Sequence, residues 1–145
     1  MNEAFHHIRK KYIDRLTGQI TISGSAVPIY NRIPNGASTP YIRIYSHLED
    51  EIDENQSSYT TECVTKIECF TSYISDNGGE YILNQIVDGV LNLVRTRSSG
   101  YIDLSSEGFN VYTTTIERVR YLEDYEDDQT WFRAIIEVAN RVEKT

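Results

Sequence analysis

Two adjacent histidines, His6 and His7, are the first residues whose type suits metal binding or acid–base chemistry. They fall in a segment with helical spacing, where adjacent side chains diverge by about 100° and do not readily share one ion. The third histidine, His47, lies in or just after a predicted strand, and no serine or aspartate is singled out as its partner. We therefore interpret the three as ordinary histidines rather than metal ligands or catalytic bases.

Two clusters of carboxylates have the residue type that binds calcium. The first cluster consists of Glu49, Asp50, Glu51, Asp53 and Glu54. The second cluster consists of Glu123, Asp124, Glu126, Asp127 and Asp128. Neither follows the D-x-[DN]-x-[DN]-G pattern of an EF-hand, in which a glycine makes the sharp turn around the ion. We expect both clusters to be solvated turns or loops, the first within 48–58.

Motifs for nucleophilic or phosphate chemistry are missing from the chain. It contains no G-x-S-x-G elbow, no G-x-x-x-x-G-K-[ST] loop and no G-x-G-x-x-G fingerprint. Gly78 and Gly79 precede a predicted helix, and a helix cap explains them better than a phosphate site. The sequence therefore predicts no catalytic residue, no metal and no cofactor.

The two cysteines, Cys63 and Cys69, are six residues apart within one predicted strand. At roughly 3.3 Å per residue they lie on the same face about 20 Å apart, which is too far for a disulfide. No second pair completes a zinc site. We expect both to be buried free thiols.

The spacing of apolar residues predicts two helices and several strands. Three-and-four spacing marks helices over 3–16 and 80–95. Alternation predicts strands over 41–47, 59–73, 109–121 and 130–142, with shorter extended stretches at 19–23, 27–31 and 101–104. The predicted core consists of Ile42, Ile44, Ile67, Ile82, Leu83, Ile86, Val90, Leu91, Ile136 and Val138.

This order of elements predicts one α+β domain over residues 1–145, a mostly antiparallel sheet covered on one face by two helices. The chain has 145 residues and a net charge of −8, with 22 acidic and 14 basic side chains. Such a charge gives no general attraction to nucleic acid or to an anionic membrane. No stretch is apolar enough to span a bilayer. We expect a cytoplasmic origin and no membrane partner.

One segment, residues 27–44, carries a family resemblance. It reads VPIYNRIPNGASTPYIRI and combines an Asn-Gly turn with the core Pro40-Tyr41-Ile42. In this it resembles the small tail-completion proteins of tailed bacteriophages, a family that includes tail-terminator-like proteins. The order of helix, segment, variable loop, long strand, helix and final strands is also similar over most of the chain. One departure is Phe70-Thr71 near the end of the long strand, where the family carries Trp-Ser.

The resemblance implies a structural protein of the virion, assembled in the host cytoplasm and located in the tail or neck. Such proteins form a ring, here six or twelve copies, that adjoins connector, portal or tail-tube proteins while DNA passes through without specific binding. The segments 48–58 and 96–108, which are long and polar, would then reach neighbouring subunits or flanking rings. The expected contact residues are Glu49, Asp50, Glu51, Asp53, Glu54, Arg97 and Tyr101.

The acidic surplus suits a channel wall that repels DNA, so at least one acidic cluster is expected to face the lumen of the ring. The expected lumen residues at the second cluster are Glu123, Asp124, Glu126, Asp127 and Asp128. The alternative interpretation is a small α+β enzyme or ligand-binding domain unrelated to phages.

Overall fold

The computed structural model describes residues 3–52, 60–74, 78–95 and 102–145. Its elements, in chain order, are α1 (Phe5–Leu16), β1 (Thr21–Ile22), β2 (Ser25–Ala26), β3 (Ile29–Tyr30), β4 (Tyr41–Ile52), β5 (Thr60–Ile74), α2 (Tyr81–Val94), the short 3-10 helix η1 (Ser105–Glu107), β6 (Phe109–Glu126) and β7 (Gln129–Lys144). Both predicted helices form within two residues of their expected bounds.

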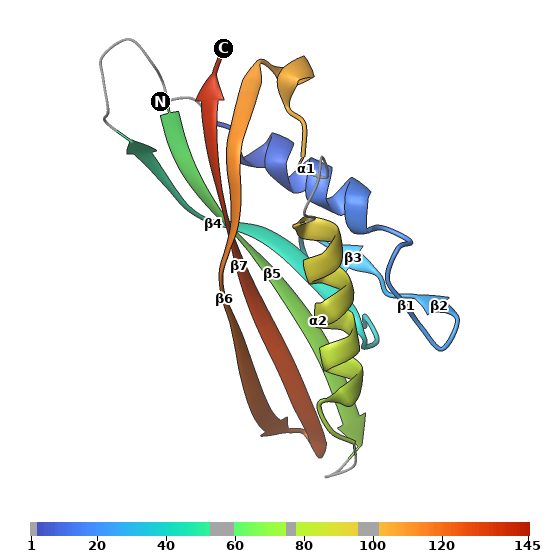
Figure 1. Ribbon diagram of the computed structural model, residues 1–145. Coiled ribbons are helices and arrows are strands. Elements are labelled where there is room, and N and C mark those ends of the chain that lie inside the picture. The colour runs from blue at the N-terminus through green and yellow to red at the C-terminus, as the bar shows by residue number, and fades with distance from the viewer. Residues whose placement is uncertain (1–2, 53–59, 75–77, 96–101) are drawn as a thin grey trace.

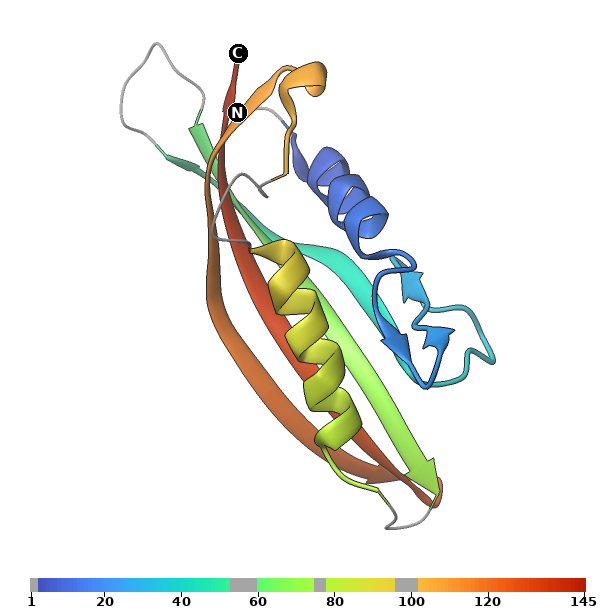
Figure 2. The ribbon, with the colours of Figure 1, turned by 45° about the vertical axis from the view of Figure 1, so that its right-hand side comes forward.

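Five strands form one sheet in the order β3-β4-β5-β7-β6, and β1 pairs separately with β2. All neighbours in the large sheet are antiparallel except β3 and β4, which are parallel. Figures 1 and 2 show α1 and α2 on the same face of this sheet. The predicted α+β architecture is therefore confirmed.

The core lies between the two helices and that face of the sheet. Of the ten predicted core residues, eight are fully buried, namely Ile42, Ile44, Ile67, Leu83, Ile86, Val90, Ile136 and Val138. Ile82 and Leu91 pack against the core but are only partly buried. They occupy the two borders of the apolar stripe of α2, where the curvature of a helix turns side chains back toward solvent.

The expected loop over 48–58 is wrong in its first part. β4 continues to Ile52, and its pairing with β5 resumes after an irregularity between Ser46 and Leu48. An antiparallel ladder keeps adding backbone hydrogen bonds whatever the side chains are, so acidic residues do not end the strand. Residues 53–59 lie outside the described part of the chain.

The expected acidic turn over 123–128 is also wrong in extent. β6 runs to Glu126, and only Asp127 and Asp128 form the turn before β7. Both have left-handed backbone angles, with φ of 53° and 59°. Two such residues make a type I′ turn, whose twist matches that of the flanking strands, and aspartate tolerates it better than most residues. The result is one long β6–β7 hairpin.

The connection after α2 differs from its prediction as well. Its described part, from Ile102 onward, forms no strand at 102–104 but leads into η1. Ile102 and Leu104 are buried in the core, with exposed fractions of 5% and 1%. Burial of these two side chains anchors this part of the connection to its own subunit. Arg97 and Tyr101, expected to contact neighbours, lie outside the described residues.

Cys63 and Cys69 are both buried free thiols, as predicted. Burial raises the pKa of each thiol to about 12, and nearby carboxylates, Glu49 for Cys63 and Glu68 for Cys69, act in the same direction. Because the thiolate is the reactive form, we expect neither residue to react measurably with Ellman's reagent at pH 8 in the folded protein. Both should react once the chain is unfolded in guanidinium. Rapid reaction of the folded protein would contradict this prediction.

Candidate functional site

The candidate site is the face of the large sheet opposite α1 and α2, which we call the open face. Side chains alternate between the faces of a strand, so the registers of the four long strands determine which residues share this face. No helix of the described chain covers it (Figure 1). The central residues of the open face are Tyr41, Arg43, Tyr45, Lys66, Glu68, Phe70, Arg118, Arg120, Leu122, Arg133, Ile135 and Glu137.

Glu137 is a buried carboxylate in the middle of the open face, with only 7% of the residue exposed. Its Oε2 lies 3.0 Å from Nε of Arg118, and its Oε1 lies 3.8 Å from Nζ of Lys66. These contacts join β5, β7 and β6 across one row of the sheet. A buried charge is costly unless it is paired, so the two cations explain how Glu137 is tolerated there.

A second buried carboxylate, Glu68, lies in the adjacent row toward β4. The hydroxyl of Tyr45 donates a hydrogen bond to its Oε1. Partial burial and this bond to Glu68 raise the pKa of Tyr45 to about 12. The guanidinium of Arg43 lies 4.3 Å from the centre of the Tyr45 ring, a cation–π contact. Charged and aromatic groups therefore hold one another in fixed positions on this side of the sheet.

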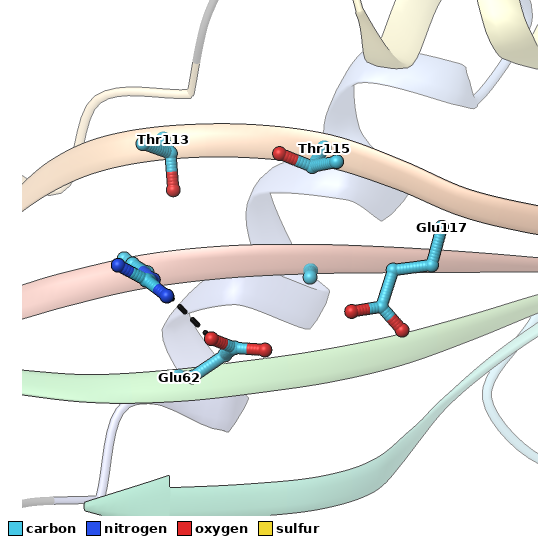
Figure 3. Close-up of a pocket in the computed structure, with 6 residues that line it drawn as sticks. Glu62, Thr113, Thr115 and Glu117 are labelled. Carbon is cyan, nitrogen blue, oxygen red and sulfur yellow. Dashed lines mark hydrogen bonds and ion pairs between the residues drawn. The ribbon is translucent and has the colours of Figure 1, made fainter. Parts of the chain in front are cut away.

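Figure 3 shows a shallow polar hollow over β5, β7 and β6 near one end of the open face. It is lined by Glu62, Thr113, Thr115, Glu117, Ala139 and Arg141. Nε of Arg141 lies 3.2 Å from Oε2 of Glu62, and the carboxylates of Glu62 and Glu117 both lie between the ribbons of β5 and β7 (Figure 3). The hollow offers charged groups and threonine hydroxyls for contact.

A second hollow lies near the other end of the open face. It is lined by Tyr41, Phe70, Trp131, Arg133, Asp124 and Glu126. The rings of Tyr41 and Phe70 are 5.0 Å apart between centres, and Nε of Arg133 is buried without a hydrogen-bond partner. Aromatic side chains with a charged rim are typical of surfaces that bind other proteins.

The side chains of the first acidic cluster lie in different environments. Glu49 turns toward α1, where its carboxylate contacts the backbone N–H of Ala4 and Sγ of Cys63, and burial raises the pKa of Glu49. Asp50 and Glu51 are exposed on β4. Asp53 and Glu54 lie outside the described residues.

The second acidic cluster is exposed at the tip of the β6–β7 hairpin. The described residues of the first cluster and those of the second lie at opposite ends of the sheet, because Ile52 pairs with Thr60 at one end of β5 while Ile74 pairs with Gln129 at the other. They form two separate negative regions rather than one surface. Asp124 and Glu126 belong in addition to the second hollow.

The imidazoles of His6 and His7 lie closer than expected, with ring centres 3.8 Å apart. Nδ1 of His6 lies 2.5 Å from Oε2 of Glu3, and the ring of His7 contacts that of Phe109. Among the described residues, no group of three side chains is placed to hold a metal ion.

No helix in the described part of the chain is long and apolar enough to cross a membrane.

The buried carboxylates Glu68 and Glu137 were not among the candidate site residues predicted from the sequence. The pattern that could have indicated them is the alternation of charge along neighbouring strands, with Lys66 and Glu68 on one and Arg133 and Glu137 on the other.

Comparison with known proteins finds no matching family model and no similar curated sequence.

Proposed function

We propose that the chain is a structural subunit of a tailed-bacteriophage virion, which assembles into a ring of six or twelve copies at the tail end or the head–tail junction. The open face is the observation that carries this proposal. A sheet exposed on one face normally presents simple polar side chains there. This one instead presents aromatic rings, buried carboxylates and two hollows, which suit contact with another protein surface.

The segment 27–44 supports the phage assignment through its resemblance to tail-completion proteins. In the fold it supplies β3, the turn after Pro34 and the start of β4, and it ends in the buried pair Ile42 and Ile44. The resemblance thus involves residues that shape one edge of the sheet. Neighbouring connector, portal or tail-tube proteins are the proposed partners.

The assignment is tested in purified particles of a phage that encodes this chain. We expect mass spectrometry to find the chain at six or twelve copies per particle, and a gold-labelled tag to mark one end of the tail or the neck. If the chain is missing from purified particles, or if label runs along the whole tail, the proposal is wrong.

Neutralising the second acidic cluster tests whether DNA passes near it. Replacing Glu123, Asp124, Glu126, Asp127 and Asp128 by Gln or Asn should leave the unfolding temperature nearly unchanged, because all five are exposed. DNA ejection from particles carrying this variant should slow if the cluster lines the channel. Salt screens the repulsion between carboxylates and DNA beyond about 8 Å, so only carboxylates close to the DNA affect its passage. Ejection at the normal rate, or a ring structure with the cluster on its outer surface, would contradict a lumenal position.

The alternative function, a small ligand-binding domain, draws on the second hollow. Its aromatic side chains and the buried, unpartnered Nε of Arg133 would suit a small planar anion. A screen of aromatic carboxylates by ligand-observed NMR distinguishes a ligand-binding domain from a structural subunit. Binding that is lost in Arg133→Gln would favour it over the structural role.

A further inference from the structure

β6 is the edge strand of the sheet along all 18 of its residues. Within residues 3–52, 60–74, 78–95 and 102–145, no segment pairs with its outer side. α2 packs on β5 and β7, and η1 contacts β6 at the end that starts with Phe109. An edge of this length presents a row of unpaired backbone groups, which is a template for another strand.

The half of β6 nearest the turn is regular. Irregularities interrupt the pairing with β7 between Val111 and Thr113 and between Ile116 and Arg118, whereas residues 118–126 pair without a break. Bulges are one of the devices that keep edge strands from pairing with other chains, and this half lacks them. It also contains no proline.

The turn determines which backbone groups of this half point outward. Around a type I′ turn the flanking residues, here Glu126 and Gln129, form a hydrogen-bonded pair. In an antiparallel ladder such pairs alternate with pairs whose backbone groups point away. The residues with outward N–H and C=O groups are therefore Val119, Tyr121, Glu123 and Tyr125.

The side chains between them carry a self-complementary charge pattern. On the open face, residues 118, 120, 122, 124 and 126 read Arg, Arg, Leu, Asp and Glu. We infer that a second copy of this chain pairs with this edge across a two-fold axis at Leu122, so that the two β6 strands join two sheets into one. Arg118 then lies opposite Glu126 and Arg120 opposite Asp124, twice each.

This register is the one that the charges favour. It places the outward-pointing residues Tyr121 and Glu123 opposite each other, as hydrogen bonding requires. A two-fold axis at Arg120, Glu123 or Asp124 would instead place that charged residue opposite its own copy. Like charges directly opposite are destabilising, whereas opposite charges stabilise a sheet.

Arg118 already contacts Glu137 of its own chain through Nε. A guanidinium has five N–H donors, so a second carboxylate from the other copy can approach the same side chain. The row Lys66, Glu137 and Arg118 would thereby continue into Glu126 of the second copy. The charged row of one open face would extend across the interface.

The pairing is independent of the proposed place in a virion. A two-fold contact cannot join neighbours around a single cyclic ring. The β6–β6 pairing is therefore a contact of the free protein, in which it covers the exposed edge strand before the ring assembles. The measurements below use the purified chain alone, so they succeed or fail whatever the particle experiments show.

Charge exchange at one pair of positions tests the contact. We expect sedimentation velocity of the wild type to show a dimer whose dissociation constant rises with salt. Arg120→Glu and Asp124→Arg, both at exposed positions, should each weaken self-association by at least about tenfold, because each places like charges opposite twice. Mixed in equal amounts, the two variants should form a heterodimer, since both facing pairs are again opposite in charge.

A cysteine at the axis tests the register. In the proposed dimer Leu122 faces its own copy in a pair with Cα atoms about 4.5 Å apart, within disulfide reach. Leu122→Cys should therefore form a disulfide-linked dimer under mild oxidation. Tyr125→Cys is the control, because Tyr125 lies on the same edge and is more exposed than Leu122, 64% against 38%, but is about 20 Å from its copy in this register.

Three results would overturn the inference. One is a wild-type protein that stays monomeric across the concentration series. Another is dimerisation that neither single charge variant alters. The third is disulfide formation by Leu122→Cys no faster than by Tyr125→Cys.

Discussion

Replacing Leu83 or Ile86 with alanine is expected to lower the free energy of unfolding by about 2–5 kcal/mol for each variant. Both side chains are fully buried between α2 and the sheet. Removing them deletes apolar contacts and leaves a cavity that packed neighbours fill only in part. Urea denaturation followed by circular dichroism measures the loss as a shift of the midpoint at constant slope.

Asn84→Ala is the matched control for these variants. Asn84 lies on the same helix, next to Leu83, but is exposed. Its replacement should change the unfolding free energy by less than about 0.5 kcal/mol. Losses below about 1 kcal/mol at both core positions would show that α2 presents a different face to the sheet.

Replacing Asn140 with alanine is expected to be similarly damaging, although this residue is polar. Asn140 is fully buried, and its Oδ1 accepts a hydrogen bond of 2.8 Å from the hydroxyl of Tyr12. Its Nδ2 donates to Oγ1 of Thr114, also at 2.8 Å. The variant removes one hydrogen-bond partner from each of two buried hydroxyls, and the loss of a partner at a buried polar group costs about 1–3 kcal/mol. Thermal unfolding should show a loss of about 3 kcal/mol in total.

Tyr12→Phe provides the comparison within the same network. It removes the hydroxyl but retains the ring, so Oδ1 of Asn140 and the side chain of Thr114 each lose a bond to Tyr12. The bond between Nδ2 of Asn140 and Oγ1 of Thr114 remains, so the loss should be smaller than in Asn140→Ala. Combining Tyr12→Phe with Asn140→Ala should cost less than the sum of the two, because both variants remove the same bond. Additive losses would mean that the bond does not contribute in solution. Burial raises the pKa of Tyr12 to about 12, so its hydroxyl stays a donor at neutral pH.

The candidate site could be predicted only in part from the sequence. The acidic residues of both clusters were identified by type, but Glu49 turns inward to α1 while Asp50 remains exposed. Alternation placed Lys66 and Glu68 on the face opposite the core, yet it could not reveal that Glu68 is buried there. Burial on an open face depends on large neighbours from other strands, here Tyr45, and those neighbours follow from register.

The sequence by itself determined the type and order of the main elements. The apolar spacing of α2 and the alternation along β5 and β7 are local patterns, and each matches the period of its element. The burial of Cys63 and Cys69 followed from the same alternation. Local periodicity was sufficient because in each case one face of the element meets the core.

Only the tertiary structure decided how far β4 and β6 extend and what lies beside them. Acidic residues at 49–51 and 123–126 carry local preferences for loops, yet both runs are strands. Their backbone groups are bonded to β5 and β7, which come from distant parts of the chain. A ladder of backbone hydrogen bonds is indifferent to side-chain charge, so strand length is determined by the partner strand and by the turn at Asp127 and Asp128.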